Sequence, residues 1–162
     1  YLQVVRGKTA ALFSAATQVG GIISAADEDI CQALVDYGDA LGIAFQIADD
    51  LLDVVGDPKS IGKNVGDDFR ERKLTLPLIK AISAGGEHDR VFWTRTIAKG
   101  DQGEGDLEHA INLMHTTGAI EATRKDALDW SNKAQQSLSL LPDSALKTIL
   151  QDLAIYVVSR VS

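Results

Sequence analysis

Three carboxylates stand close together in a part of this sequence that is otherwise mainly apolar. Asp49, Asp50 and Asp53 lie within residues 44–55. In a helix of about 3.6 residues per turn, Asp49 and Asp53 share one face, and Asp50 lies beside them. Like charges this close repel one another, and burying them costs more unless a cation or a proton compensates. The spacing therefore predicts a cation site.

The donor atoms indicate which cation would bind. No Cys or His accompanies the aspartates in residues 44–55, and a purely oxygen donor set favours a hard ion. The small number of ligands suits Mg²⁺, which keeps several waters and shares its shell with substrate phosphate oxygens. A solvated acidic edge is the alternative, and the apolar neighbours leave the two interpretations about equal at this stage.

A long and largely buried helix is needed to position the aspartates. The acidic residues 27–29 fit its start, because carboxylates stabilise the unpaired N–H groups there, and we expect the helix to run to about Val55. Its polar face continues backwards through Gln46, Gly42 and Asp39. The other positions have the spacing of a core-facing side: Leu34, Tyr37, Leu41, Phe45, Ala48, Leu52 and Val55.

The rest of the sequence is predicted to be helical, so we expect an all-α fold in which residues 1–162 form a single domain. A first helix covers residues 2–24, and Thr75 caps a helix that has Pro77 in its first turn. Further helices are expected at 89–98, 107–116 and 119–140, with a last one ending near residue 161. Residues 56–73, rich in glycine and charge, are predicted to be a loop returning over the aspartates.

Two groups of residues offer further polar contacts. Lys63 and Lys73 belong to the predicted loop, and a site for a metal-bound diphosphate needs such charges to balance the remaining phosphate oxygens. Lys8 and Thr9 lie together in the first predicted helix. Considered singly, each group is better explained without a ligand, as a solvated charged loop and as a snorkelling lysine beside a surface threonine. The glycines of the loop do not make a Walker motif, because the spacing is wrong and no strand precedes it.

The composition of the chain argues against several classes of partner and of protein. The formal net charge of −7, without a basic run, argues against nucleic acid or an anionic membrane surface as a partner. No apolar run approaches the roughly 18 residues of a membrane span, so we expect no integral membrane protein. The single cysteine, Cys31, excludes an internal disulfide, suits a reducing cytoplasm and is expected in the core. Tyr1 begins in apolar helical register, which predicts that the chain is part of a longer protein.

Four motifs follow one another along the chain as Lys8-Thr9, Phe45-Gln46-Ile47-Ala48-Asp49-Asp50-Leu51-Leu52-Asp53, Gly62-Lys63-Asn64-Val65-Gly66-Asp67-Asp68 and Lys73-Leu74-Thr75-Leu76-Pro77. Considered together, they resemble the C-terminal half of a trans-polyprenyl diphosphate synthase. The resemblance covers essentially the whole chain, and its details are similar to the bacterial long-chain branch that makes quinone side chains.

This resemblance implies the C-terminal part of an isoprenoid-synthase helical bundle and a homodimer in the full-length enzyme. Two aspartate-rich motifs would face each other there and bind diphosphate through Mg²⁺. The reaction implied is the condensation of an allylic diphosphate with isopentenyl diphosphate. By the matching of motifs, the second aspartate-rich motif is Asp49, Asp50 and Asp53, and the residues that contact the allylic diphosphate or the metal cluster are Lys8, Thr9, Gln46, Lys63 and Lys73.

One departure is large, because the first aspartate-rich motif and the basic residues that bind isopentenyl diphosphate are not in this sequence. We therefore expect this chain to be inactive alone. Two other functions stay open, a non-catalytic subunit of a heteromeric prenyl synthase and a terpene synthase of the same fold. The intact second motif argues against the former, and the Gly-Lys and Lys-Leu-Thr-Leu-Pro elements argue against the latter.

Overall fold

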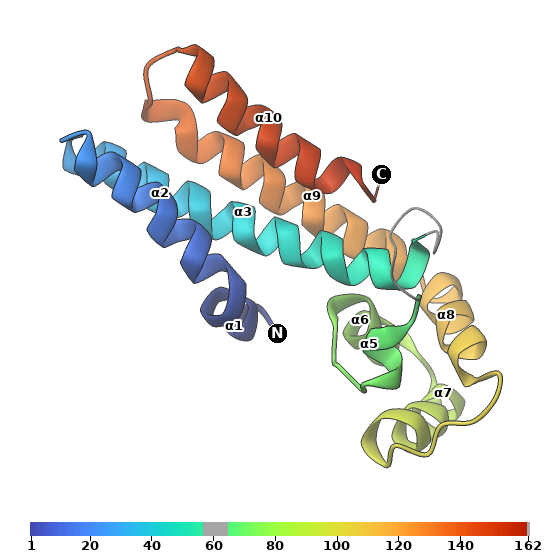
Figure 1. Cartoon of the computed structure of the whole chain (residues 1–162). Helices are drawn as coiled ribbons and strands as arrows, with labels where there is room; N and C mark the ends of the chain where they lie inside the picture. The colour runs from blue at the N-terminus through green and yellow to red at the C-terminus, as the bar shows by residue number, and fades with distance from the viewer. Residues whose placement is uncertain (57–64, 162) are drawn as a thin grey trace. The chain divides into compact units, whose positions relative to one another are not determined.

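Every regular element in the described residues is a helix. The structure, a computed structural model, describes residues 1–56 and 65–161. In chain order the elements are α1 (Leu2–Val5), η1 (Arg6–Ala10), α2 (Ala11–Ile23), α3 (Glu28–Val55), α5 (Asp67–Arg70), α6 (Leu76–Ala84), α7 (Glu87–Trp93), η2 (Thr94–Ala98), α8 (Asp106–Thr116), α9 (Ala119–Ser137), η3 (Leu138–Leu140) and α10 (Ala145–Ser159), as drawn in Figure 1. The predicted all-α fold is confirmed.

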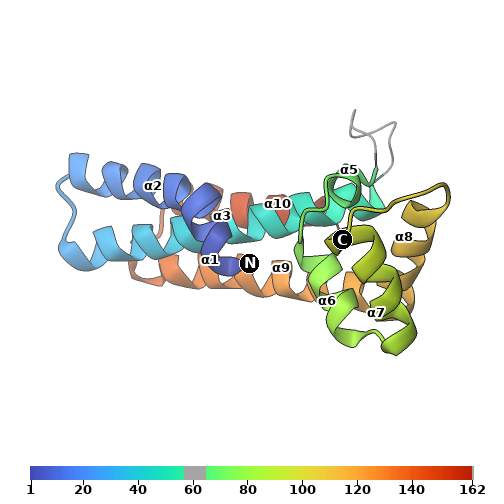
Figure 2. The ribbon, with the colours of Figure 1, turned by 90° about the horizontal axis from the view of Figure 1, so that it is seen from below.

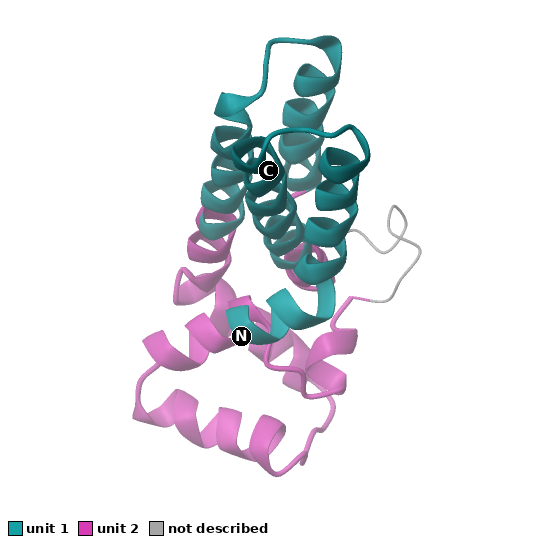
Figure 3. Cartoon of the chain, turned by 90° about the vertical axis from the view of Figure 1, so that its left-hand side faces the viewer, with its two compact units in different colours: residues 1–48, 126–160, 162 teal, residues 49–125, 161 magenta. Residues whose placement is uncertain are grey.

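The described residues form two compact units, shown in different colours in Figure 3. Unit 1 contains residues 1–48 and 126–160, and unit 2 contains residues 49–125 and 161. The long helix α3 contributes residues to both. The sequence-based prediction of a single domain stays a prediction.

In unit 1, α2 lies alongside the first part of α3 (Figures 1 and 2). Two glycines on α3 permit a very close approach. A Cβ on Gly38 would lie 2.5 Å from the Cα of Ser14, and a Cβ on Gly42 would lie 2.5 Å from the Cα of Ala10. The Ser14 hydroxyl also donates to the carbonyl of Val35 at 3.0 Å. The missing side chains therefore let α2, at Ser14, and the preceding segment η1, at Ala10, approach α3 closely.

Helix α10 is held to its neighbours in unit 1 by two buried hydroxyls. The Tyr37 hydroxyl on α3 donates to the carbonyl of Leu150 at 2.8 Å, and Ser131 on α9 donates to the carbonyl of Ala154 at 2.7 Å. The Tyr37 side chain is fully buried, and this burial raises its pKa to about 12. A buried hydroxyl needs such a partner, because an unsatisfied one costs about 1–3 kcal/mol.

Unit 2 has its own core, formed largely by apolar side chains of α6, α7, α8 and the start of α9. A charged pair ties η2 to the start of α8. The Arg95 guanidinium binds both carboxylate oxygens of Asp106 at 2.6 and 2.9 Å and holds the pKa of Asp106 down to about 2. Asp106 also accepts from the Gly103 amide at 2.7 Å. The largest apolar side chains of the core are Leu51, Phe69, Leu78, Phe92, Trp93, Leu113, Met114 and Ile120.

The predicted limits of the long helices are close to the observed ones, although the helices predicted at 89–98 and 119–140 end in the π-helical segment η2 and the 3-10 segment η3. Three further differences are found. The first predicted helix contains a π-helical segment, Arg6–Ala10, between α1 and α2. Part of the predicted loop is the short helix α5. Thr75 is the N-cap of α6, as predicted, but its hydroxyl makes no capping hydrogen bond.

Burial along α3 also differs from the prediction in places. Tyr37, Leu41 and Ala48 are buried as expected, whereas the predicted core residues Leu34, Phe45, Leu52 and Val55 are half-buried. Cys31 is half-buried rather than in the core, in the first turns of α3 beside Gly21 of α2. No helix in the described part of the chain is long and apolar enough to cross a membrane.

Candidate functional site

The three aspartates predicted as metal ligands lie near the C-terminal end of α3, in unit 2. Their environments differ. Asp49 and Asp53 are half-buried, whereas Asp50 is only 4% exposed. Across the described residues, no group of three or more His, Cys, Asp or Glu side chains is arranged to hold a metal ion. The aspartates are thus close in sequence without forming a ready-made cage.

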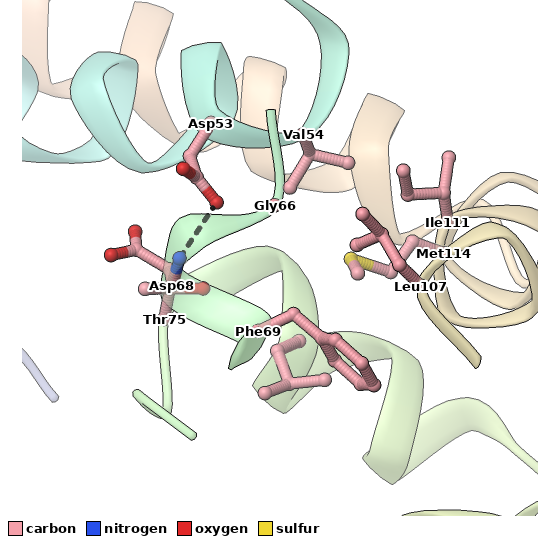
Figure 4. A pocket seen from close by; sticks show the side chains of 10 residues that line it. Asp53, Val54, Gly66, Asp68, Phe69, Thr75, Leu107, Ile111 and Met114 are labelled. Carbon is pink, nitrogen blue, oxygen red and sulfur yellow. Dashed lines mark hydrogen bonds between the residues drawn. The ribbon is translucent and has the colours of Figure 1, made fainter. Parts of the chain in front are cut away.

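Asp53 binds the start of α5 through both of its carboxylate oxygens. Oδ1 accepts from the Asp67 amide and Oδ2 from the Asp68 amide, each at 3.1 Å, and the second bond is the dashed line in Figure 4. The Gly66 amide donates to the Asp53 carbonyl at 2.8 Å. Asp53 therefore satisfies the free amides of the short helix, as a capping residue does.

Gly66 is required at the turn into α5. Its φ is +85°, a conformation that costs other residues energy, and a Cβ there would lie 2.3 Å from the Leu107 side chain. The turn presses the acidic start of α5 against the end of α3. Burial, followed by the charge of Asp68, raises the pKa of Asp53, although the two amide hydrogen bonds oppose that rise.

Lys73 is held at the other end of the α5 segment. Its ammonium group lies 3.1 Å from Asp68 Oδ1 and 2.6 Å from Glu71 Oε2. The Lys73 amide donates to the Asp68 carbonyl at 2.9 Å, and Arg72 between them has φ of +57°. This left-handed residue after the helix end is the usual helix-termination motif, here with arginine where glycine is the common choice. The turn therefore folds the Lys73 side chain back onto Asp68 and Glu71.

The second predicted group lies in unit 1. The Thr9 hydroxyl donates to Gln46 Oε1 at 2.9 Å, so the structure brings together two residues that are 37 positions apart. Thr9 and Lys8 belong to the π-helical segment Arg6–Ala10, and such segments are frequent at functional sites. Gly42, one turn before Gln46, is the glycine that lets Ala10 approach α3. Lys8 is exposed.

A cavity behind Asp53 is too small to be a substrate site. It lies in unit 2, is bounded by Asp53, Asp68 and Thr75 on the polar side, and has a volume of about 10 Å³ (Figure 4). Its other lining is apolar, including Phe69 and Met114. A volume of this size holds about one water molecule.

Of the predicted site residues, Lys63 lies outside the described residues. The structure pairs Thr9 with Gln46, and it pairs Lys73 with Asp68 and Glu71 rather than with the aspartates of α3. Sequence reasoning missed the roles of Asp68 and Glu71. The one available signal was the run Asp67–Arg70, where two acidic residues after a glycine are typical of a helix start.

The residues present fit a Mg²⁺ ion that a ligand helps to hold. Asp49 and Asp53 are one turn apart on α3. Mg²⁺ is commonly bound by one or two carboxylates together with phosphate oxygens and waters, so no cage of three carboxylates is needed. Burial first, and then the neighbouring charges of Asp68 and Asp67, raise the pKa of Asp53, so negative charge is in excess beside it. A divalent cation would offset that excess.

The proteins of known family that this chain is similar to are prenyl diphosphate synthases. The family model described as polyprenyl synthetase matches residues 1–114. The chain is 40% identical over 160 residues to octaprenyl diphosphate synthase of Escherichia coli, a match that covers 99% of this chain and 49% of the relative. A short chain isoprenyl diphosphate synthase of Methanothermobacter thermautotrophicus is 39% identical over the same length.

Solved structures of the same kind share the fold. A decaprenyl diphosphate synthase from Rhodobacter capsulatus is 63% identical, with a TM-score of 0.94 over 100% of this chain and 50% of its own. A polyprenyl synthase from Caulobacter crescentus, solved with calcium and isoprenyl diphosphate, is 42% identical with a TM-score of 0.94, over 100% of this chain and 49% of its own. The chain thus spans about half the length of the relatives it matches. The fold is that part of the isoprenoid-synthase helical bundle, and the chain belongs to the polyprenyl synthetase family.

Proposed function

We propose that this chain is the part of a chain-elongating trans-prenyltransferase that binds the allylic diphosphate. The observation that carries the proposal is the pair Asp49 and Asp53, one turn apart on α3 beside a segment with excess negative charge. The Caulobacter crescentus relative, solved with calcium and isoprenyl diphosphate, supports a divalent cation and a diphosphate as the ligands. The ion for this chain is proposed to be Mg²⁺.

The proposed reaction breaks the allylic carbon–oxygen bond and releases diphosphate. The double bond of isopentenyl diphosphate then attacks the allylic carbocation, and loss of a proton restores a double bond in the lengthened chain. Bound Mg²⁺ supplies positive charge that stabilises the departing diphosphate. Asp49, Asp50 and Asp53 are proposed to hold that ion.

The remaining predicted residues are assigned to the diphosphate itself. Lys8, Lys63 and Lys73 are proposed to neutralise its oxygens as negative charge builds on them. Thr9 and Gln46 share a hydrogen bond, and this bond is proposed to orient the Gln46 amide for a contact with the ligand. Apolar faces of the bundle are proposed to keep water from the carbocation.

A long polyprenyl chain is the proposed product, as a precursor of quinone side chains. The 63% identity to a decaprenyl diphosphate synthase supports this length class. The complete enzyme is proposed to be a homodimer acting in the cytoplasm and to supply the first aspartate-rich motif, since this sequence contains only one D-D-x-x-D. A single domain spanning residues 1–162 and continuing in the N-terminal half remains part of this proposal.

Thermal unfolding with and without ligand tests the metal site. Inorganic diphosphate with millimolar Mg²⁺ should raise the melting temperature, because a ligand at 100 times its Kd stabilises the folded state by about 2.7 kcal/mol. For a chain of this size that is a rise of about 5–10 °C. Asp49→Asn should remove most of the rise. Asp49 is the better position to change than Asp53, whose carboxylate also caps α5.

Asp36→Asn is the matched control, since Asp36 is an exposed aspartate on the same helix whose side chain bonds only to Gln32 among the described residues. It should leave the rise unchanged. An equal response of the wild type and the Asp49→Asn variant would contradict the proposal and favour a solvated acidic edge.

A further inference from the structure

Lys73 is neutralised by its own segment before any ligand arrives. Its ammonium group contacts two carboxylates, at 3.1 Å in Asp68 and 2.6 Å in Glu71. An ammonium has three N–H donors, so two of them are already used. Those two hydrogen bonds, to Glu71 first and then to Asp68, raise the pKa of Lys73. Lys73, Asp68 and Glu71 together carry a net negative charge, and a diphosphate that approaches the lysine meets this charge.

The two carboxylates are held very differently. The Asp68 side chain is 20% exposed, its amide donates to Asp53, and its carbonyl accepts from the Lys73 amide. The Glu71 side chain is 61% exposed, and Lys73 is its one polar partner among the residues described. Glu71 can therefore turn into solvent at little cost, whereas moving Asp68 would disturb both the α5 turn and its bond to Asp53.

We infer that Glu71 is an internal competitor for the diphosphate, which must displace this carboxylate from Lys73, while Asp68 keeps the lysine in position. Glu71 thereby weakens the binding of a diphosphate and speeds its release. The inference rests on the proposed function, since it takes Lys73 to be a diphosphate ligand. It adds a positioning residue, Asp68, and an affinity-setting residue, Glu71, neither of which needs to touch the reacting atoms.

The size of the effect follows from the exposure of the pair. Exposed ion pairs contribute only a fraction of a kcal/mol each, so removing Glu71 should tighten diphosphate binding by about two- to five-fold. The gain is electrostatic, and it should shrink when the salt concentration rises from about 0.05 M to 0.5 M, where the Debye length falls well below 10 Å. A structural effect of the substitution would not depend on salt in this way.

Calorimetric titration of the whole 162-residue chain with inorganic diphosphate in Mg²⁺ tests the inference. The variants are Glu71→Gln, Lys73→Gln and the double variant. Glu104→Gln is the control, because Glu104 is an exposed glutamate of the same unit with no ion pair to a described residue. Glu71→Gln should tighten binding about two- to five-fold, Glu104→Gln should not, and Glu71→Gln should have no effect once Lys73 is replaced.

The possible results distinguish a failure of the competitor role of Glu71 from a failure of the proposed diphosphate site. Equal small gains for Glu71→Gln and Glu104→Gln, or a gain that persists without Lys73, would overturn the competitor role while diphosphate binding by the wild type stands. No binding by the wild type or any variant would overturn the proposed diphosphate site, and the competitor role with it. Circular dichroism of each variant shows whether the helices are retained, as expected for exposed positions.

Discussion

At the level of the single residue, Asp53 is a predicted metal ligand that also caps a helix. The sequence predicts it as a metal ligand, and the structure shows its two oxygens bonded to the amides of Asp67 and Asp68. Each carboxylate oxygen has further lone pairs, so a cation can bind beside these amides. A change at Asp53 would remove a helix cap as well as a charge, and a cap contributes about 1 kcal/mol. A substitution at Asp49 therefore tests metal binding without also removing the cap of α5.

The buried hydrogen bond of Tyr37 can be tested by a single substitution. Tyr37→Phe removes the hydrogen bond to the Leu150 carbonyl and should lower the free energy of unfolding by about 1 kcal/mol at neutral pH. Burial raises the pKa of Tyr37 to about 12 in the folded chain, against 10.0 for the ordinary side chain. The unfolded chain therefore loses this proton first, and the contribution of Tyr37 to stability is complete below pH 10 and falls as the pH rises towards 12.

Urea unfolding of the wild type and Tyr37→Phe between pH 8 and 11.5 measures this dependence. The difference between the two should shrink at the alkaline end. Tyr156→Phe is the control, because that side chain is 65% exposed. A difference that stays constant across this range, or one as small as that of Tyr156→Phe, would contradict the account of Tyr37.

At the level of elements, the contact between η1 and α3 depends on glycine. Gly42→Ala places a Cβ 2.5 Å from the Ala10 backbone, so the helices must separate. Overpacking of this kind typically costs about 1–3 kcal/mol, which exceeds the helix-propensity gain of about 1 kcal/mol. Gly20→Ala in α2 meets open space and should be neutral or stabilising. Urea unfolding compares the two, and equal stability of both variants would show that the contact is not tight.

The sequence predicted the helices because their periodic apolar pattern and end signals are local. Helix α3 was predicted to begin at residues 27–29 and to end near Val55, and it covers Glu28–Val55. The pairing of Thr9 with Gln46 was not predictable from either helix alone, since it depends on Gly42 and on the π-helical segment. Nothing in local propensity marks that segment.

The α5 turn escaped prediction for a related reason. Asp67–Arg70 is too short to show a period, and its stability comes from a distant residue, Asp53, that accepts its amides. The placement of Lys73 depends in turn on Arg72 in a left-handed conformation, which sequence rules assign to glycine. Sequence reasoning therefore named Lys73 as a site residue but missed the carboxylates, Asp68 and Glu71, that hold it.

At the scale of the whole molecule, the chain spans about half the length of its relatives and carries one aspartate-rich motif. Elongation joins two substrates, and holding two reactants in position contributes about 7–11 kcal/mol to lowering a barrier. One motif can hold one diphosphate. We therefore propose that this chain binds an allylic diphosphate with Mg²⁺ and needs the other half of a synthase to elongate it.

The direct measurement is an elongation assay on the purified 162-residue chain with farnesyl diphosphate, radiolabelled isopentenyl diphosphate and Mg²⁺. The assay is run with and without the N-terminal half of a long-chain polyprenyl synthase, and that half alone is the control. We expect no butanol-extractable product from either half alone and long-chain product when both are present. Long-chain product from the 162-residue chain alone would contradict the account.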